Sequence, residues 1–125
     1  MESFFHQQVQ FTRSFTKKLN EQLSEVGLFQ SQWSIIYYLY HFKTSTLVEI
    51  SNYFEVEKPT ITRTVNRVEE RKLIEKVPSS DKRERRVRLT DKGIKVYKEA
   101  KLIVDKFENK LISDISKEQL DITLN

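Results

Sequence analysis

Residues 58–95 read KPTITRTVNRVEERKLIEKVPSSDKRERRVRLTDKGIK, and this stretch decides the fold. Its first part predicts an amphipathic helix, and the remainder predicts a β-hairpin with an arginine-rich turn and return strand. The stretch holds thirteen Lys and Arg against six Asp and Glu, a net charge of +7, whereas the rest of the chain carries −3. Such polarity is typical of a surface that binds a polyanion. The alternative is an ordinary solvated charged surface.

The expected helix has an apolar and a polar face. At about 100° per residue, Ile61, Val65 and Val68 share one side. Arginine pairs bidentately with guanine and asparagine with adenine, so the opposite side is suited to the major groove of DNA. An amphipathic surface helix without a ligand is the alternative. The candidate recognition residues are Pro59, Thr60, Thr62, Arg63, Asn66 and Arg67.

A second, shorter helix is expected just before this one. Thr46 and Glu49 form a capping box, in which each side chain satisfies a backbone N–H at a helix start. This helix runs to about Phe54, and Pro59 then fits the first turn of the next helix. A short helix, a tight turn and a second helix make up a helix-turn-helix.

The hairpin is interpreted as a wing. Residues 78–81 form its turn-rich tip, and the alternation in residues 86–89 predicts a strand with Val87 and Leu89 facing the core and Arg86 and Arg88 facing out. Arginines on a protruding tip can enter a minor groove, where the potential is negative. Asp81 is expected to orient a neighbouring arginine. The candidate wing residues are Asp81, Lys82, Arg83, Arg85 and Arg86.

Helical patterns flank this unit. Apolar residues over 4–26 form a stripe wider than one packing face needs, which indicates contact with a second subunit or, alternatively, a deeply buried helix. A helix with Ser31 as N-cap is expected over 31–42, and a long helix after the N-cap Thr90. A capping box at Ser116 predicts one more helix. Two-fold dimers match palindromic operators.

Composition narrows the function. A chain of 125 residues is expected to be one domain, and without cysteine it has no disulfide, thiolate metal site or thiol sensor. The longest apolar run, residues 35–40, is too short to span a bilayer, so a soluble cytoplasmic protein is expected. His6 and His41 lack metal-ligand spacing, and no nucleophile or phosphate-loop motif is present. We therefore expect neither an enzyme nor a cofactor.

With these residues assembled, the chain resembles the MarR-type winged-helix transcriptional regulators over almost its full length. The most specific match is Asp81-Lys82-Arg83 followed by Val87-Arg88-Leu89-Thr90 and Gly93. The other matching pieces are Leu28, Gln32-Trp33, Thr46-Leu47-Val48-Glu49-Ile50, Pro59-Thr60-Ile61-Thr62-Arg63 with Val65 and Arg67, and Leu73-Ile74.

The resemblance implies a mainly α fold with a small β-wing. Residues 30–93 would form the winged helix-turn-helix lobe, and residues 1–27 and 94–125 the dimerisation helices. The protein would be a sequence-specific double-stranded DNA-binding regulator, a repressor acting as a homodimer on a palindromic operator, with Arg83 the wing-tip arginine and Asp81 its positioning carboxylate. A winged helix used only for protein assembly is the alternative.

Many members of the family release DNA when a small aromatic or anionic ligand enters a cleft between the dimer helices and the lobe. The aromatic side chains of Phe11, Phe15, Tyr37 and Tyr40 permit such a pocket, although core packing is the alternative. The sequence departs from the family at Lys72, where Gly is common, and at Phe29, where a capping Thr or Ser is usual. The C-terminus is also shorter than is customary.

Overall fold

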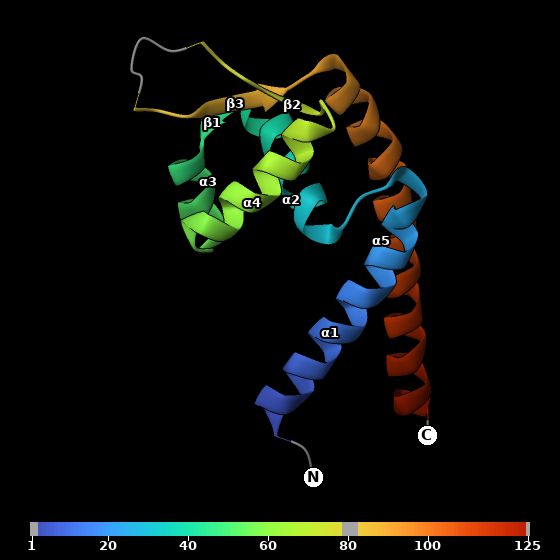
Figure 1. Ribbon diagram of the computed structural model, residues 1–125. Helices are drawn as coiled ribbons and strands as arrows, with labels where there is room; N and C mark the ends of the chain where they lie inside the picture. Colours follow the sequence, from blue (N-terminus) through green and yellow to red (C-terminus); the bar gives the residue numbers. More distant parts are fainter. Residues whose placement is uncertain (1–2, 79–82, 125) are drawn as a thin grey trace.

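The chain folds into a helical lobe with a small sheet, from which two long helices extend (Figure 1). A computed structural model describes residues 3–78 and 83–124. The elements are α1 (Phe4–Leu23), η1 (Ser24–Val26), α2 (Gln30–Phe42), β1 (Thr44–Thr46), α3 (Leu47–Phe54), α4 (Lys58–Glu70), β2 (Ile74–Lys76), β3 (Arg86–Leu89) and α5 (Asp91–Leu124). The expected mainly α fold with a β-wing is confirmed.

The wing strands belong to an antiparallel sheet of order β1-β3-β2. Strand β3 pairs with β2 as the expected hairpin, and Val77 N donates to Arg86 O at 2.8 Å where the pairing ends. Its other edge pairs with β1, where Ser45 lies opposite Val87. The sequence pattern does not predict strand β1, because its three Thr and Ser residues show no apolar alternation. The strand forms by pairing with a segment about forty positions later in the chain.

One hydrophobic core joins the lobe to the long helices. The apolar face of α4 is buried as predicted, with Ile61 at 5% and Val65 and Val68 at 0% exposure. Trp33 of α2 stacks on Tyr97 of α5 with ring centroids 5.5 Å apart, and Tyr40 stacks on the same ring. The first turns of α5 are therefore fixed to the lobe, which holds α4 in position.

The free ends of α1 and α5 lie at the bottom of Figure 1, on the opposite side of the molecule from the sheet. Helix α5 continues without a break to Leu124. The prediction of a separate helix beginning at Ser116 is therefore wrong. Serine and glutamate at that spacing are also acceptable inside a helix, so the capping-box pattern alone does not end the preceding one.

Helix ends follow local chemistry. Gly27, the C-cap of η1, has φ +70°, the left-handed conformation that glycine adopts readily at a helix end. Ser31 is not an N-cap, because α2 begins one residue earlier, at Gln30, after Phe29. The carboxamide oxygen of Gln32 accepts from Phe29 N at 3.1 Å, and that of Asn20 accepts from Gln30 N at 2.6 Å. Two amide side chains thus replace the missing hydroxyl cap.

The turn after α4 is tight and carries two long-range contacts. Lys72, at the position where Gly is common in the family, adopts φ +64°, a left-handed conformation in which glycine would be unstrained. Arg71, the C-cap of α4, donates through Nη1 to the carbonyl oxygen of Gly27 at 2.5 Å and through Nη2 to that of Val26 at 3.5 Å. The end of α4 is thereby tied to the turn between α1 and α2.

Candidate nucleic-acid interface

Helix α4 presents its polar face to solvent. Pro59, Thr60, Arg63, Asn66 and Arg67 are exposed, and Thr62 is half-buried. Pro59 lies in the first helical turn, and Arg63 Nη2 donates to Thr60 Oγ1 at 3.3 Å. The predicted recognition residues therefore share one accessible helix face, backed by the buried valines.

The expected protruding position of Arg85 is wrong for this structure, because its side chain lies against α4. Its Nη2 atom donates to Asn66 Oδ1 at 2.8 Å and to Glu69 Oε2 at 3.0 Å. Glu69 is not among the candidate residues predicted from the sequence. The spacing of Asn66 and Glu69, three residues apart and hence on one side of the helix, was the available signal.

Arg86 does not face freely outward either. Its side chain is 31% exposed, and its guanidinium contacts Glu84 Oε1 at 2.7 Å, Glu49 Oε1 at 3.3 Å and, through Nη1, Thr44 Oγ1 at 3.0 Å. Two carboxylates neutralise this arginine, so it joins the wing to β1 and α3 instead of projecting.

The capping box at the start of α3 is confirmed. Thr46 Oγ1 accepts from Glu49 N at 3.1 Å, and Glu49 Oε1 accepts from Thr46 N at 3.2 Å. The hydrogen bonds from the Thr46 hydroxyl and backbone N–H, with Arg86 nearby, lower the pKa of Glu49. The carboxylate is therefore ionised when it contacts Arg86.

The outer part of the wing is only partly described. Arg83 is exposed, and Arg88 is half-exposed with its Nε donating to Glu75 Oε1 at 2.9 Å. Val87 is fully buried, as predicted, and Leu89 is partly buried against the core. Asp81 and Lys82 lie outside the described residues, and so does any contact between Asp81 and Arg83.

The four aromatic residues considered for a ligand pocket do not line one cavity. Phe11 and Phe15 line a groove between α1 and α5, and Phe15 packs on Phe107 with centroids 5.4 Å apart. Tyr37 lines a different groove between α2, α3 and α5, together with Trp33, Tyr38, His41, Phe42 and Tyr53. Tyr40 is stacked on Tyr97. The second groove is the more aromatic one.

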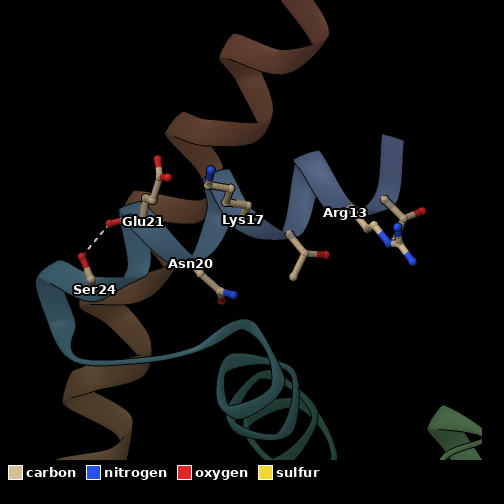
Figure 2. Close-up of a pocket in the computed structure, with 7 residues that line it drawn as sticks. Arg13, Lys17, Asn20, Glu21 and Ser24 are labelled. Carbon is tan, nitrogen blue, oxygen red and sulfur yellow. Dashed lines mark hydrogen bonds between the residues drawn. The ribbon is translucent and has the colours of Figure 1, made fainter. Parts of the chain in front are cut away.

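A hollow on the outer side of α1 has no convergent chemistry (Figure 2). In that view Lys17 and Glu21 leave the helix on one side and Asn20 on the other. Ser24 Oγ donates to the carbonyl of Glu21 at 2.6 Å, so the hydroxyl is used in ending the helix. This is a solvated helix face.

Residues 3–78 and 83–124 show neither a cluster of metal ligands nor a membrane-spanning helix. No group of three or more metal-binding side chains gathers there. None of the helices in this part of the chain is both long enough and apolar enough to cross a bilayer.

Comparison with known proteins agrees with this geometry. The model of the MarR family matches residues 26–84, which include the helix-turn-helix and strand β2 and end before strand β3. An HTH-type transcriptional regulator of Bacillus subtilis, YwoH, is 42% identical over 113 residues, or 90% of this chain and 82% of its own length. The chain belongs to the MarR family. The family and its named relatives are transcriptional regulators and not enzymes.

Further relatives and solved structures extend the match. The HTH-type regulator SAV2265 of Staphylococcus aureus is 30% identical over 99% of this chain and 87% of its own. Among solved structures, a complex of S. aureus MepR with DNA has a TM-score of 0.85 at 22% identity, covering 99% of this chain and 95% of that one. MarR from E. coli, in its apo form, has a TM-score of 0.79 at 20% identity, covering 91% and 85%. These structures show that the chain has the MarR-family winged-helix fold.

Proposed function

We propose that this MarR-family regulator binds double-stranded DNA sequence-specifically, with α4 in the major groove and the wing at the flanking minor groove. The observation that carries the proposal is the exposed polar face of α4, with Arg63, Asn66 and Arg67 pointing away from a fully buried Val65 and Val68. Arginine and asparagine are the side chains that read base edges most directly. The exposed Arg83 supplies a cation to the wing.

The proposed active form is a homodimer on a palindromic operator, acting in the cytoplasm as a repressor. Large apolar side chains are exposed along α1 and α5, where a second copy would cover them: Phe4 76%, Phe5 76%, Phe11 51%, Leu102 74%, Ile112 62% and Ile115 39%. Surfaces of this kind mark protein interaction sites. A two-fold dimer places its recognition helices about one DNA turn apart, which suits a palindrome.

Duplex titration over a range of salt tests DNA binding. Affinity should fall steeply, with a slope on the order of −0.9 per phosphate contact. Arg83→Ala should weaken binding chiefly at A·T-rich flanks, because a narrow minor groove attracts arginine most, and it should change thermal stability little. Arg13→Ala, which removes the same charge from the exposed outer side of α1, is the matched control and should change neither.

Two outcomes would contradict these assignments. If the unsubstituted protein and Arg83→Ala each bind duplexes with different flanking sequences equally well, the wing does not contact the DNA. Binding without salt dependence, or no duplex binding at all, would favour a winged helix that only assembles with other proteins.

A small aromatic effector is proposed to enter the groove between α2, α3 and α5. Rings of Trp33, Tyr37 and Tyr38 line it, and α5 contributes Lys101 and Asp105. Lys101 Nζ donates to both oxygens of Asp105, at 2.5 and 2.7 Å, and this hydrogen bonding raises the pKa of Lys101. With its ammonium already paired and Glu108 adding another carboxylate, the groove suits a neutral or cationic aromatic compound better than an anion.

The effector proposal can be checked with the single tryptophan, Trp33, which lies in this groove. Neutral or cationic aromatic compounds should change its fluorescence and release DNA in the same concentration range, since one binding event causes both. Benzamidine is the cationic test compound, and benzoate, an anionic aromatic compound, is the comparison. Stronger fluorescence changes and stronger DNA release with benzoate than with benzamidine would reverse the charge assignment.

A further inference from the structure

Arg85 connects the base of the wing to the DNA-facing side of α4. Asn66 and Glu69 lie about one helical turn apart on α4, and Nη2 of Arg85 donates to both, at 2.8 Å to Asn66 Oδ1 and at 3.0 Å to Glu69 Oε2. Glu69 forms an ion pair with Arg85, with side-chain exposures of 41% and 33%. Bonds between ionised partners are stronger than neutral ones, so the carboxylate holds the guanidinium beside Asn66.

Arg85 is also fixed through its backbone. Its carbonyl oxygen accepts from Leu47 N, the first residue of α3, at 3.2 Å. Strand β3 begins with the next residue, Arg86. The guanidinium therefore approaches α4 from a backbone position that both α3 and the sheet determine.

The chemistry of arginine settles the orientation of the Asn66 amide. A guanidinium has five N–H donors and no acceptor, so an amide that faces it must present its oxygen. The Asn66 amino group then points away from Arg85. Asn66 itself is exposed, between Arg63 and Arg67 on the polar face of α4.

This orientation favours one kind of base edge. To read adenine, asparagine must accept from N6 with its oxygen while donating to N7, whereas guanine offers two acceptors, N7 and O6. The oxygen of Asn66 is already bonded to a cation, which weakens it as an acceptor for adenine. The same cation attracts acceptor atoms on the base.

We infer that Arg85 is a positioning residue that makes Asn66 an N–H donor selecting guanine over adenine. The inference rests on the proposed DNA binding and extends it to the specificity of one contact. It revises the adenine pairing suggested by the residue type of Asn66 alone.

Selection of bound sites from a random duplex library tests the inference. Asn66→Ala identifies the base pair concerned, as the position that loses its preference, and the unsubstituted protein should prefer guanine there. Arg85→Met keeps the side-chain length but has no N–H donors, so the amide is released, and guanine-over-adenine preference should fall about fivefold or more. Arg85→Lys, also a pure donor, should retain the preference.

Two further variants make the result specific. Arg88→Met removes an arginine of β3 whose ion pair is with Glu75 of β2, and it should leave the base preference unchanged. If Arg85→Met fails to fold, the Asn66→Asp variant is tested instead. An aspartate keeps an oxygen toward Arg85 but has no outward donor, so guanine preference should be lost in a folded protein.

Results that contradict the role of Arg85 differ from the result that would contradict DNA binding itself. An adenine preference in the unsubstituted protein, an unchanged preference in Arg85→Met, or an Asn66→Ala variant that alters no position would overturn the inference. So would a uniform loss of affinity across all sequences in Arg85→Met, which is the behaviour of a phosphate contact. An unsubstituted protein that selects no sequence would instead overturn the proposed function.

Discussion

Gly93→Ala is expected to lower the free energy of unfolding by about 3 kcal/mol, the upper end of the usual cost of overpacking. A Cβ atom at residue 93 would lie 2.0 Å from the carbonyl oxygen of Leu73 and 3.0 Å from its carbon. That oxygen also accepts from Thr90 N at 3.0 Å, so the backbone of the turn after α4 cannot move aside cheaply. Alanine would otherwise stabilise a helix by roughly 1 kcal/mol relative to glycine. A loss of stability therefore measures the clash.

Denaturant unfolding followed by Trp33 fluorescence is the measurement, at one fixed protein concentration because association changes apparent stability. Gly27→Ala is the graded comparison. The Cβ there meets only the end of the Arg71 side chain, at 3.1 Å, and the main penalty is the left-handed conformation, about 1–2 kcal/mol. A Gly93→Ala protein as stable as the unsubstituted one would show that α5 does not approach the turn this closely.

Leu102→Glu is expected to convert the proposed dimer into monomers and to weaken binding to a two-half-site operator about a hundredfold or more, because linked binding of two half-sites is lost. Leu102 is 74% exposed on α5 and lines the groove beside Phe11 and Phe15 of α1. A carboxylate buried there by a second copy would be costly to desolvate.

Light scattering gives the oligomeric state, and duplex titration gives the affinity. Val48→Glu is the matched control, since it also places a carboxylate on an exposed apolar residue, 50% accessible, but on α3 within the lobe. Val48→Glu should remain dimeric. If Leu102→Glu also remains dimeric, the α5 face is not the subunit interface.

Periodicity predicted most of the fold because it reports burial. The alternation at Val87 and the helical spacing of Ile61, Val65 and Val68 each gave the correct buried face. Local hydrogen bonding predicted the caps at Thr46 and Thr90, whose Oγ1 accepts from Gly93 N at 3.0 Å. These features depend on residues only a few positions apart, so sequence spacing is enough to identify them.

The missed strand and the misplaced arginines depend on distant partners. Strand β1 forms because β3 offers it an edge, which Thr44-Ser45-Thr46 alone does not indicate. Arg85 and Arg86 look like free wing cations until Glu69 and Glu49 approach them in the fold. A count of charges along the chain overstates the cations available to DNA, because it cannot show which ones are already paired.

The contact of Arg71 with the turn at residues 26 and 27 has a consequence for tolerance to mutation. Its acceptors are main-chain oxygens, so the residue type at 26 can drift without weakening the tie, provided the turn keeps its shape. At position 71, lysine would give one ammonium where the planar guanidinium spans two neighbouring carbonyls. Substitutions at position 26 should therefore leave this contact intact, whereas substitutions of Arg71 should weaken it.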